Sequence, residues 1–279
     1  SFAPPPGTRL MGLLMRGEDL GGDVGSELDV TLQRGNVVTG TVRASGVPVG
    51  DVDVDVDDVA GGRVYTPDDN SDLVSGVYRV VVPAGTHRFR FEPPLGSRLR
   101  GAEIDSIDTS SDAVLDVDLV EGLLLTGRVT GTGGAAAFDV DVDLRDRITG
   151  EKIFLANNAT DLQGDYSVAV PAGTFQLRYA PPRGSRLVAS LEDSVVFATD
   201  LDRDVSLSTG SLVGLTVRDP DGAVVPDADL DVKDRATGIK VFTPHDRTDV
   251  LGRAEAALPP GLADPATHPA PGPHPGRAR

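Results

Sequence analysis

Hydrophobic and polar residues alternate along much of this chain, and the alternation is clearest between residues 166 and 179. Apolar side chains occupy every second position in two successive runs: Tyr166, Val168 and Val170, then Phe175, Leu177 and Tyr179. A period of two is typical of a strand with one buried face. A Pro-Ala-Gly segment at 171–173 separates the runs, and because these residues favour turns we expect a β-hairpin.

This pattern belongs to a repeat. Residues 78–99 reproduce 166–187 at an offset of 88, and the segments that begin at Asp51, Asp139 and Asp227 are also 88 residues apart. Each copy has a glycine in its first expected strand, and we expect Gly40, Gly127 and Gly214 to be equivalent positions. For the second copy we expect seven strands, at about 124–131, 138–145, 152–156, 165–170, 174–180, 186–191 and 200–207.

Short strands at regular spacing with Gly, Pro and Asp turns predict an all-β fold of tandem seven-stranded, Ig-like β-sandwich domains. Copies of this length are large enough for separate cores, so we expect beads on a string. The predicted divisions are a C-terminal remnant of a preceding repeat at 1–35, repeat 1 at 36–122, repeat 2 at 123–210, an incomplete repeat 3 at 211–261 and a Pro-rich tail at 262–279. Because prolines lack a backbone donor, we expect the tail to be disordered.

The two ends of the chain are complementary. Residues 3–10 resemble 180–187, so the segment 1–35 corresponds to the part of a repeat that the third copy lacks. One interpretation is that the chain is a slice of a longer repeat array. The other is end-to-end self-association, in which residues 1–35 of one molecule complete the third domain of the next.

The run from Thr160 to Phe175, Thr-Asp-Leu-Gln-Gly-Asp-Tyr-Ser-Val-Ala-Val-Pro-Ala-Gly-Thr-Phe, resembles the carboxypeptidase regulatory-like domain, a transthyretin-like (prealbumin-like) β-sandwich. The resemblance covers both full copies and most of the third, which has Ala254 in place of Tyr78 and Tyr166. It implies a structural or adhesive role in a secreted or cell-surface protein, and it carries over no catalytic residues.

Composition limits the partners. The chain has 279 residues, a formal net charge of −17 and no cysteine. Such acidity disfavours nucleic acid, and the lack of cysteine excludes disulfides and zinc–thiolate sites. No apolar run is long enough to predict a membrane span.

Aspartates alternate with apolar residues in each copy and form ladders on one face of a strand, where like charges repel. One interpretation is a solvated face or pairing with cross-strand arginines such as Arg88 and Arg90. The other is calcium, which binds carboxylate oxygens. No other cofactor is expected. The calcium candidates are Asp51, Asp53, Asp139, Asp141, Asp161, Asp227 and Asp229.

Nothing in the sequence predicts catalysis: no Gly-x-Ser-x-Gly or His-Glu-x-x-His motif occurs, and the carboxylates recur in every copy as a structural feature would. We therefore expect a non-enzymatic structural stalk or adhesion region whose partner is another protein or a surface ligand. The alternative is a calcium- or carbohydrate-binding accessory module of a secreted hydrolase, although aromatic residues, at 4% of the chain, are few for sugar platforms.

Overall fold

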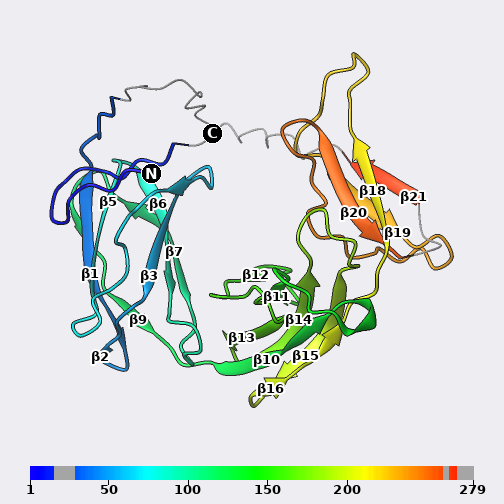
Figure 1. Ribbon diagram of the computed structural model, residues 1–279, viewed down its shortest axis with the longest axis horizontal. Helices are drawn as coiled ribbons and strands as arrows, with labels where there is room; N and C mark the ends of the chain where they lie inside the picture. Colours follow the sequence, from blue (N-terminus) through cyan, green and yellow to red (C-terminus); the bar gives the residue numbers. More distant parts are fainter. Residues whose placement is uncertain (16–28, 260–263, 269–279) are drawn as a thin grey trace, which may run out of the picture. The chain divides into compact units, whose positions relative to one another are not determined.

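The computed structural model describes residues 1–15, 29–259 and 264–268, and its regular structure is almost entirely β-strand (Figure 1). The chain divides into two compact units. The first comprises Ser1–Leu124, Phe154–Asn157 and Val168–Pro171, and the second comprises Leu125–Ile153, Asn158–Ser167 and Ala172–Arg279. No helix in the described part is long and apolar enough to cross a membrane.

The first copy is a sandwich of two sheets. One sheet has the order β2-β1-β5, and β8 and β9 add to β1 in parallel; the other has the order β4-β3-β6-β7. The strands are β1 (Asn36–Ala44), β2 (Val47–Pro48), β3 (Asp53–Asp58), β4 (Arg63–Val64), β5 (Val77–Val82), β6 (Thr86–Glu92), β7 (Ala102–Asp108), β8 (Ala113–Val114) and β9 (Val117–Leu119).

The second copy repeats this arrangement. Its sheets are β13-β10-β16, with β17 also on β10, and β12-β11-β14-β15. The strands are β10 (Leu123–Thr130), β11 (Asp141–Asp146), β12 (Lys152–Ile153), β13 (Asp165–Val170), β14 (Gly173–Ala180), β15 (Ser190–Phe197), β16 (Leu201–Asp202) and β17 (Val205–Ser206), with one 3-10 turn, η1 (Thr132–Gly134). The tandem sandwich fold expected from the repeat is therefore confirmed.

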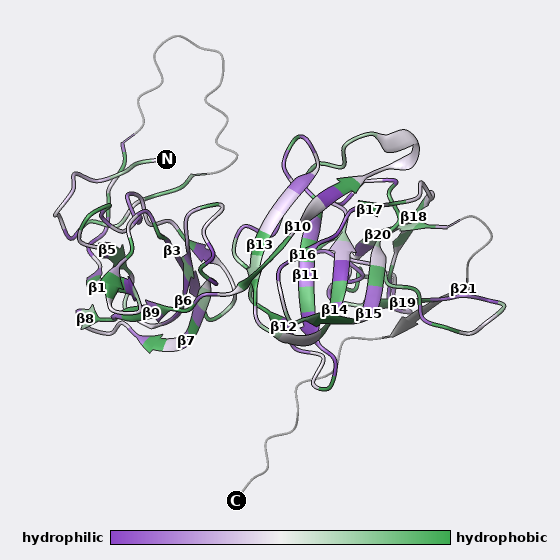
Figure 2. Ribbon diagram, turned by 90° about the horizontal axis from the view of Figure 1, so that it is seen from below, coloured by the Kyte–Doolittle hydropathy of each residue, from purple (hydrophilic) through white to green (hydrophobic). Residues whose placement is uncertain are grey.

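The cores are built from the alternating apolar positions, as the hydropathy bands along β11, β14 and β15 illustrate (Figure 2). Tyr78 and Tyr166 are buried as predicted, at 1% and 5% exposure. Their neighbours on the same strand faces are buried with them: Val80, Val82, Val168 and Val170. Each copy thus removes its own apolar stripe from water, which is the main driving force for its folding.

The predicted hairpin is wrong. β13 pairs with β10, whereas β14 pairs with β11 and β15, so Pro-Ala-Gly carries the chain from one sheet to the other. The corresponding segment after β5 does the same in the first copy. Both runs alternate because both face the same core from opposite sheets, and periodicity alone does not distinguish that arrangement from a hairpin.

Two predicted strands of the second copy also begin later than expected. β15 begins at Ser190 rather than 186, and Leu187 makes an isolated bridge to Thr209. β11 begins at Asp141 rather than 138, because Asp139 has a φ of 60°, which is incompatible with a strand.

The third copy is smaller. β18 (Ser211–Thr216) pairs with β20 (Arg253–Leu258), and β19 (Asp229–Lys233) pairs with β21 (Asp264–His268). The expectation of disorder throughout 262–279 is therefore wrong for 264–268, where antiparallel pairing with β19 tolerates Pro265 near the end of the ladder; the rest of that segment lies outside the described residues. No described strand pairs with β18 in the way that β8, β9, β16 and β17 pair with the first strands of the other copies.

The predicted equivalence of Gly214 with Gly40 and Gly127 is also wrong. Bonds of 2.8 Å from the Val42, Val129 and Val217 amides to Gly76, Gly164 and Gly252 align the three valines. Two residues before each valine stand Gly40, Gly127 and Leu215.

The presence of Leu215 in place of glycine changes which segments can cross the first strand of the third copy. A Cβ atom on Gly40 would lie 1.9 Å from the Leu115 carbonyl oxygen, and one on Gly127 would lie 2.1 Å from that of Arg203. The glycines therefore make room for the crossing segment. In the third copy a leucine side chain begins at that position and packs against the local core.

Residues 1–15 and 29–35 share one local feature with the ends of both full copies. Leu10 bridges to Arg34 as Leu99 bridges to Glu121 and Leu187 to Thr209. This shared bridge agrees with the sequence match between the N-terminal segment and the last third of a copy.

Candidate functional site

The acidic ladders lie on β3, β11 and β19, where the alternate residues are valine or leucine. Val52, Val54 and Val56 are fully buried, and the aspartates between them point away from the core. Nevertheless Asp55 and Asp57 are only 5% and 6% exposed. Because a buried carboxylate must be paired or hydrogen-bonded, their partners decide what the ladders do.

Basic side chains pair with the ladders in every copy. Asp55 pairs with Arg63, Asp143 with Lys152 at 2.7 Å, and Asp231 with Lys240. In the first copy Asp57 also pairs with Arg90 at 2.8 Å. The lateral partner comes from the short neighbouring strand, β4 or β12, or from the corresponding segment of the third copy. The structure thus shows the cationic pairing that was one of the two interpretations.

Of the seven calcium candidates, Asp53 lies in a cluster of carboxylates. Its oxygen and those of Asp55 and Asp69 lie within 4.8 Å of one another. None of the other six belongs to such a cluster among the described residues. Since the Arg63 guanidinium pairs with Asp55, a cation there would compete with an existing positive charge.

Several of the other candidates have structural partners. Asp161 accepts the backbone amides of Gln163 and Asp165 in a tight turn, at 2.8 and 2.9 Å. Asp227 pairs with Arg247 at 2.9 Å. Asp51 accepts a hydrogen bond from the Asn70 amide at 3.0 Å. Asp139 is exposed, and Asp141 and Asp229 are half-buried. Calcium binding stays a prediction.

The sequence-based list missed Asp69, which corresponds to Asn158 in the second copy and Asp246 in the third. Burial raises the pKa of Asp69, with a further contribution from Asp53. In the second copy the Asn158 amide instead donates to Asp143 at 3.0 Å, so an uncharged donor stands where the other copies have an acid. The signal was present in the repeat alignment, because the loop differs between copies at this position.

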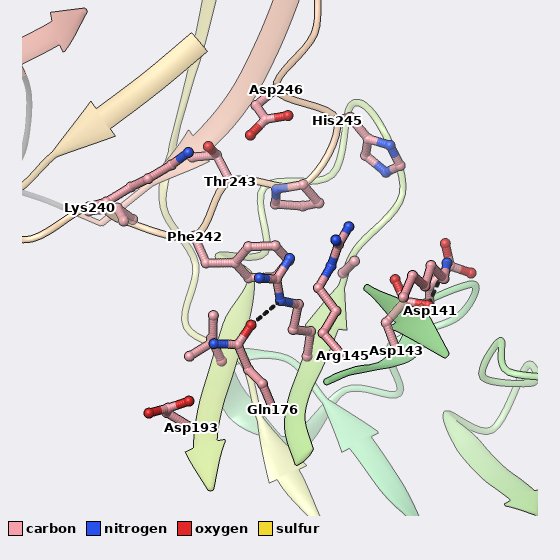
Figure 3. A pocket seen from close by; sticks show the side chains of 16 residues that line it. Asp141, Asp143, Arg145, Gln176, Asp193, Lys240, Phe242, Thr243, His245 and Asp246 are labelled. Atoms are coloured by element: carbon pink, nitrogen blue, oxygen red, sulfur yellow. Dashed lines mark hydrogen bonds and ion pairs between the residues drawn. The ribbon is translucent and has the colours of Figure 1, made fainter. Parts of the chain in front are cut away.

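A groove of about 590 Å³ lies in the second unit, on the outer face of β11, β14 and β15 (Figure 3). The segment from Lys240 to Asp246 lines it as well. Nine of its lining residues are charged or titratable: Asp141, Asp143, Arg145, Lys152, Arg178, Asp193, Lys240, His245 and Asp246. The volume falls within the range of small-ligand sites.

The charges in this groove disturb one another. Burial raises the pKa of Asp141 and Asp246, and nearby Asp143 and Asp229, respectively, add to the effect. Burial also lowers the pKa of Arg178, and the like charge of Arg145 lowers it further. The Arg178 guanidinium lies 4.8 Å from the centre of the Phe242 ring and donates to Gln176 at 2.6 Å. The sequence-based list contained Asp141 but not Arg145, Arg178 or Phe242, because it followed the aspartates.

No family model and no curated protein matches the chain. Among solved structures, the Bacillus anthracis TIE protein is 14% identical over 80% of this chain, with a TM-score of 0.25; this chain spans 43% of that protein's length. A streptococcal ancillary pilin is 11% identical over 84% of this chain and 94% of its own, with a TM-score of 0.26. A putative carbohydrate-binding protein from Bacteroides uniformis ATCC 8492 is 14% identical over 58% of this chain and 98% of its own, with a TM-score of 0.25. At such TM-scores these similarities carry no functional argument, and the fold rests on the strands described above.

Proposed function

We propose that this chain is a non-enzymatic, semi-rigid spacer of a secreted or cell-surface protein, built from domains of the carboxypeptidase regulatory-like type and serving as a stalk or adhesion region. The observation that carries this proposal is an aromatic ring that each copy places against the segment before it. We call Tyr65, Phe154 and Phe242 the junction rings; each follows directly after the strand or segment that supplies the lateral cation.

The junction rings make related contacts. Phe154 lies 5.9 Å from the Arg90 guanidinium and Phe242 lies 4.8 Å from that of Arg178, its equivalent 88 residues later. A Cβ atom on Gly101 would lie 2.7 Å from the Phe154 ring, and one on the equivalent Gly12 would lie 2.8 Å from the Tyr65 ring. A side chain at either glycine would push the ring away.

Hydrogen bonding adds to one junction, where the Asn157 amide donates to the Pro93 carbonyl at 2.9 Å. An exposed cation–π contact contributes only about 0.5–1 kcal/mol, so each junction is weak by itself. Repeated contacts of this kind would nevertheless limit bending between copies. A spacer needs limited bending, and it needs no catalytic group.

Paired spin labels test this proposal, because the chain contains no cysteine and introduced ones would be unique. Labels at Thr86→Cys and Thr174→Cys, both exposed, report the distance between the first and second copies by pulsed electron resonance. We expect one narrow distance population that broadens in Phe154→Ala. The matched control is Phe138→Ala, whose ring is 55% exposed and which should change nothing. A broad population in the parent chain, or no response to Phe154→Ala, would rule out the semi-rigid spacer.

A further inference from the structure

The repeat provides an internal reference for the charges on the outer sheet face. In the first copy Arg90 pairs with Asp57 at 2.8 Å and with Glu103 at 2.9 Å. The same three positions in the second copy are Arg178, Arg145 and Leu191. The cation is kept, but one of its two carboxylate partners has become a second arginine and the other an aliphatic residue.

The strand register shows that these positions are structurally equivalent in the two copies. Asp55 lies opposite Arg90 on β3 and β6, and Asp143 lies opposite Arg178 on β11 and β14. Asp57 lies opposite Arg88, and Arg145 opposite Gln176. The second copy therefore places two arginines diagonally across neighbouring strands, where the first copy has an ion pair.

Neither arginine has an ion-pair partner among the described residues, although the charges of Asp143 and Asp246 act on Arg178 from a greater distance. The Arg145 guanidinium donates to the Gly150 carbonyl at 2.9 Å, and that of Arg178 donates to Gln176, but no described carboxylate lies within ion-pair distance of either. Two of the nearby acids have other partners: Asp143 pairs with Lys152, and Asp193 with Arg147 at 3.3 Å. In a chain with a net charge of −17, this leaves two neighbouring arginines without a carboxylate at ion-pair distance inside a groove.

We propose that this groove binds the carboxylate of an acidic sugar, such as a uronic acid unit of a polysaccharide, between Arg145 and Arg178. A guanidinium matches a carboxylate with two parallel hydrogen bonds, so two arginines without a carboxylate partner suit one carboxylate. Leu191 and Phe242 supply apolar surface beside them. This role goes beyond the spacer function, and the two can fail independently.

The acids around the arginines favour a sugar over a ligand that has carboxylates but no hydroxyl groups. Asp141, Asp193 and Asp246 line the same groove and would repel such a ligand, for example an acidic peptide. Hydroxyl groups, by contrast, can donate hydrogen bonds to these oxygens. A ligand with one carboxylate and several hydroxyls on each unit satisfies both kinds of side chain.

Titration calorimetry of the full chain with tetragalacturonate tests the proposal. We expect saturable binding of one tetrasaccharide per chain that weakens as salt is added, since exposed charge pairs are screened. The fully methyl-esterified tetrasaccharide, which lacks the charge, should bind at least tenfold more weakly. A tetraglutamate peptide should also bind at least tenfold more weakly than tetragalacturonate. If the peptide bound more tightly than tetragalacturonate, the assignment to a sugar would be overturned.

Arg145→Asp gives the second copy the ion-pair arrangement of the first. This variant should lose at least tenfold in affinity for tetragalacturonate without losing thermal stability, because Arg178 gains a partner. Arg218→Asp is the matched control: it makes the same change in charge at an arginine that donates to the Gly222 carbonyl and does not line the groove. Arg145→Gln provides a neutral variant should the aspartate disturb folding. Absence of saturable binding, or equal losses in Arg145→Asp and Arg218→Asp, would overturn the proposal.

Discussion

Tyr166 lies in the core of the second copy, and its hydroxyl donates to the Arg203 carbonyl at 2.7 Å. It also lies 3.0 Å from the Tyr179 hydroxyl, and burial raises the pKa of Tyr179 to about 12. Removal of the ring in Tyr166→Ala should lower the free energy of unfolding by about 3–5 kcal/mol. Tyr166→Phe should cost about 1–2 kcal/mol, because the buried carbonyl loses its donor.

Urea denaturation of both variants measures these losses, and the exposed Phe138→Ala serves as the control, with an expected change within about 0.5 kcal/mol. A loss well below 1 kcal/mol in Tyr166→Ala would contradict the inward orientation of the ring.

His87 is a buried histidine whose ring lies 2.9 Å from the Thr109 hydroxyl. Burial lowers its pKa, while the Asp58 carboxylate opposes this effect. A group whose pKa is lower in the folded chain binds protons more readily when unfolded. The first copy should therefore lose stability as the pH falls through the ordinary histidine range, near 6.5, towards the lower folded pKa.

Denaturation at pH 7.5 and 5.5 should show this loss in the parent chain and a smaller one in His87→Gln. His245, which is exposed, provides the control through His245→Gln. If the pH dependence were unchanged in His87→Gln, burial of the neutral ring would not be its cause.

At the scale of the element, the tight turn before β13 depends on Gly164, which has a φ of 79°. A Cβ atom there would lie 2.4 Å from the Val129 carbonyl oxygen, whereas one on Gly150, at a φ of 74°, would meet nothing within 4 Å. Gly150→Ala should therefore cost about 1–2 kcal/mol from backbone strain alone. Gly164→Ala should cost about 1–3 kcal/mol more, because of the added clash. Equal losses in thermal denaturation would mean that the turn moves freely away from β10.

Sequence periodicity predicted the strands and their buried faces, as Tyr78 and Tyr166 show, because burial on one face imposes a period of two. It did not predict which sheet each strand joins. β13 and β14 alternate in the same way on opposite sheets, so only long-range pairing separates an arch from a hairpin. The alignment of Gly214 with Gly127 likewise matched residue types, whereas the structure aligns positions and places Leu215 there.

The candidate site was less predictable for a related reason. The aspartates were conspicuous, yet the ladders have basic partners on the neighbouring strand, such as Arg63 for Asp55 and Lys152 for Asp143. The arginines of the groove become notable only when strand register shows that they are neighbours. The repeat offset of 88 already equates Arg145 with Asp57, but only the pairing of β11 with β14 shows that Arg145 lies near Arg178.

The ladder strands also decide the response to calcium. Since lysine or arginine already pairs with each ladder, millimolar calcium should raise the melting temperature only slightly. EDTA should likewise lower the melting temperature only slightly. Asp53→Asn, in the one carboxylate cluster found among the described residues, should leave that small response unchanged. Stoichiometric micromolar binding in a calorimetric titration that Asp53→Asn abolishes would instead establish a metal site.

At the scale of the whole molecule, the steric difference at Leu215 bears on end-to-end association. In the full copies a backbone carbonyl crosses directly over Gly40 and Gly127 and accepts a hydrogen bond from Tyr78 or Tyr166. The third copy instead has Leu215 opposite Ala254, so the larger side chain of this pair lies on the strand that must be crossed. The corresponding part of residues 1–35 of another molecule cannot follow the same path there. We therefore expect the purified 279-residue chain to be monomeric by light scattering across a wide range of concentrations. Polymers that grow with concentration and disappear on deletion of residues 1–35 would show that the third copy accepts a strand by another route.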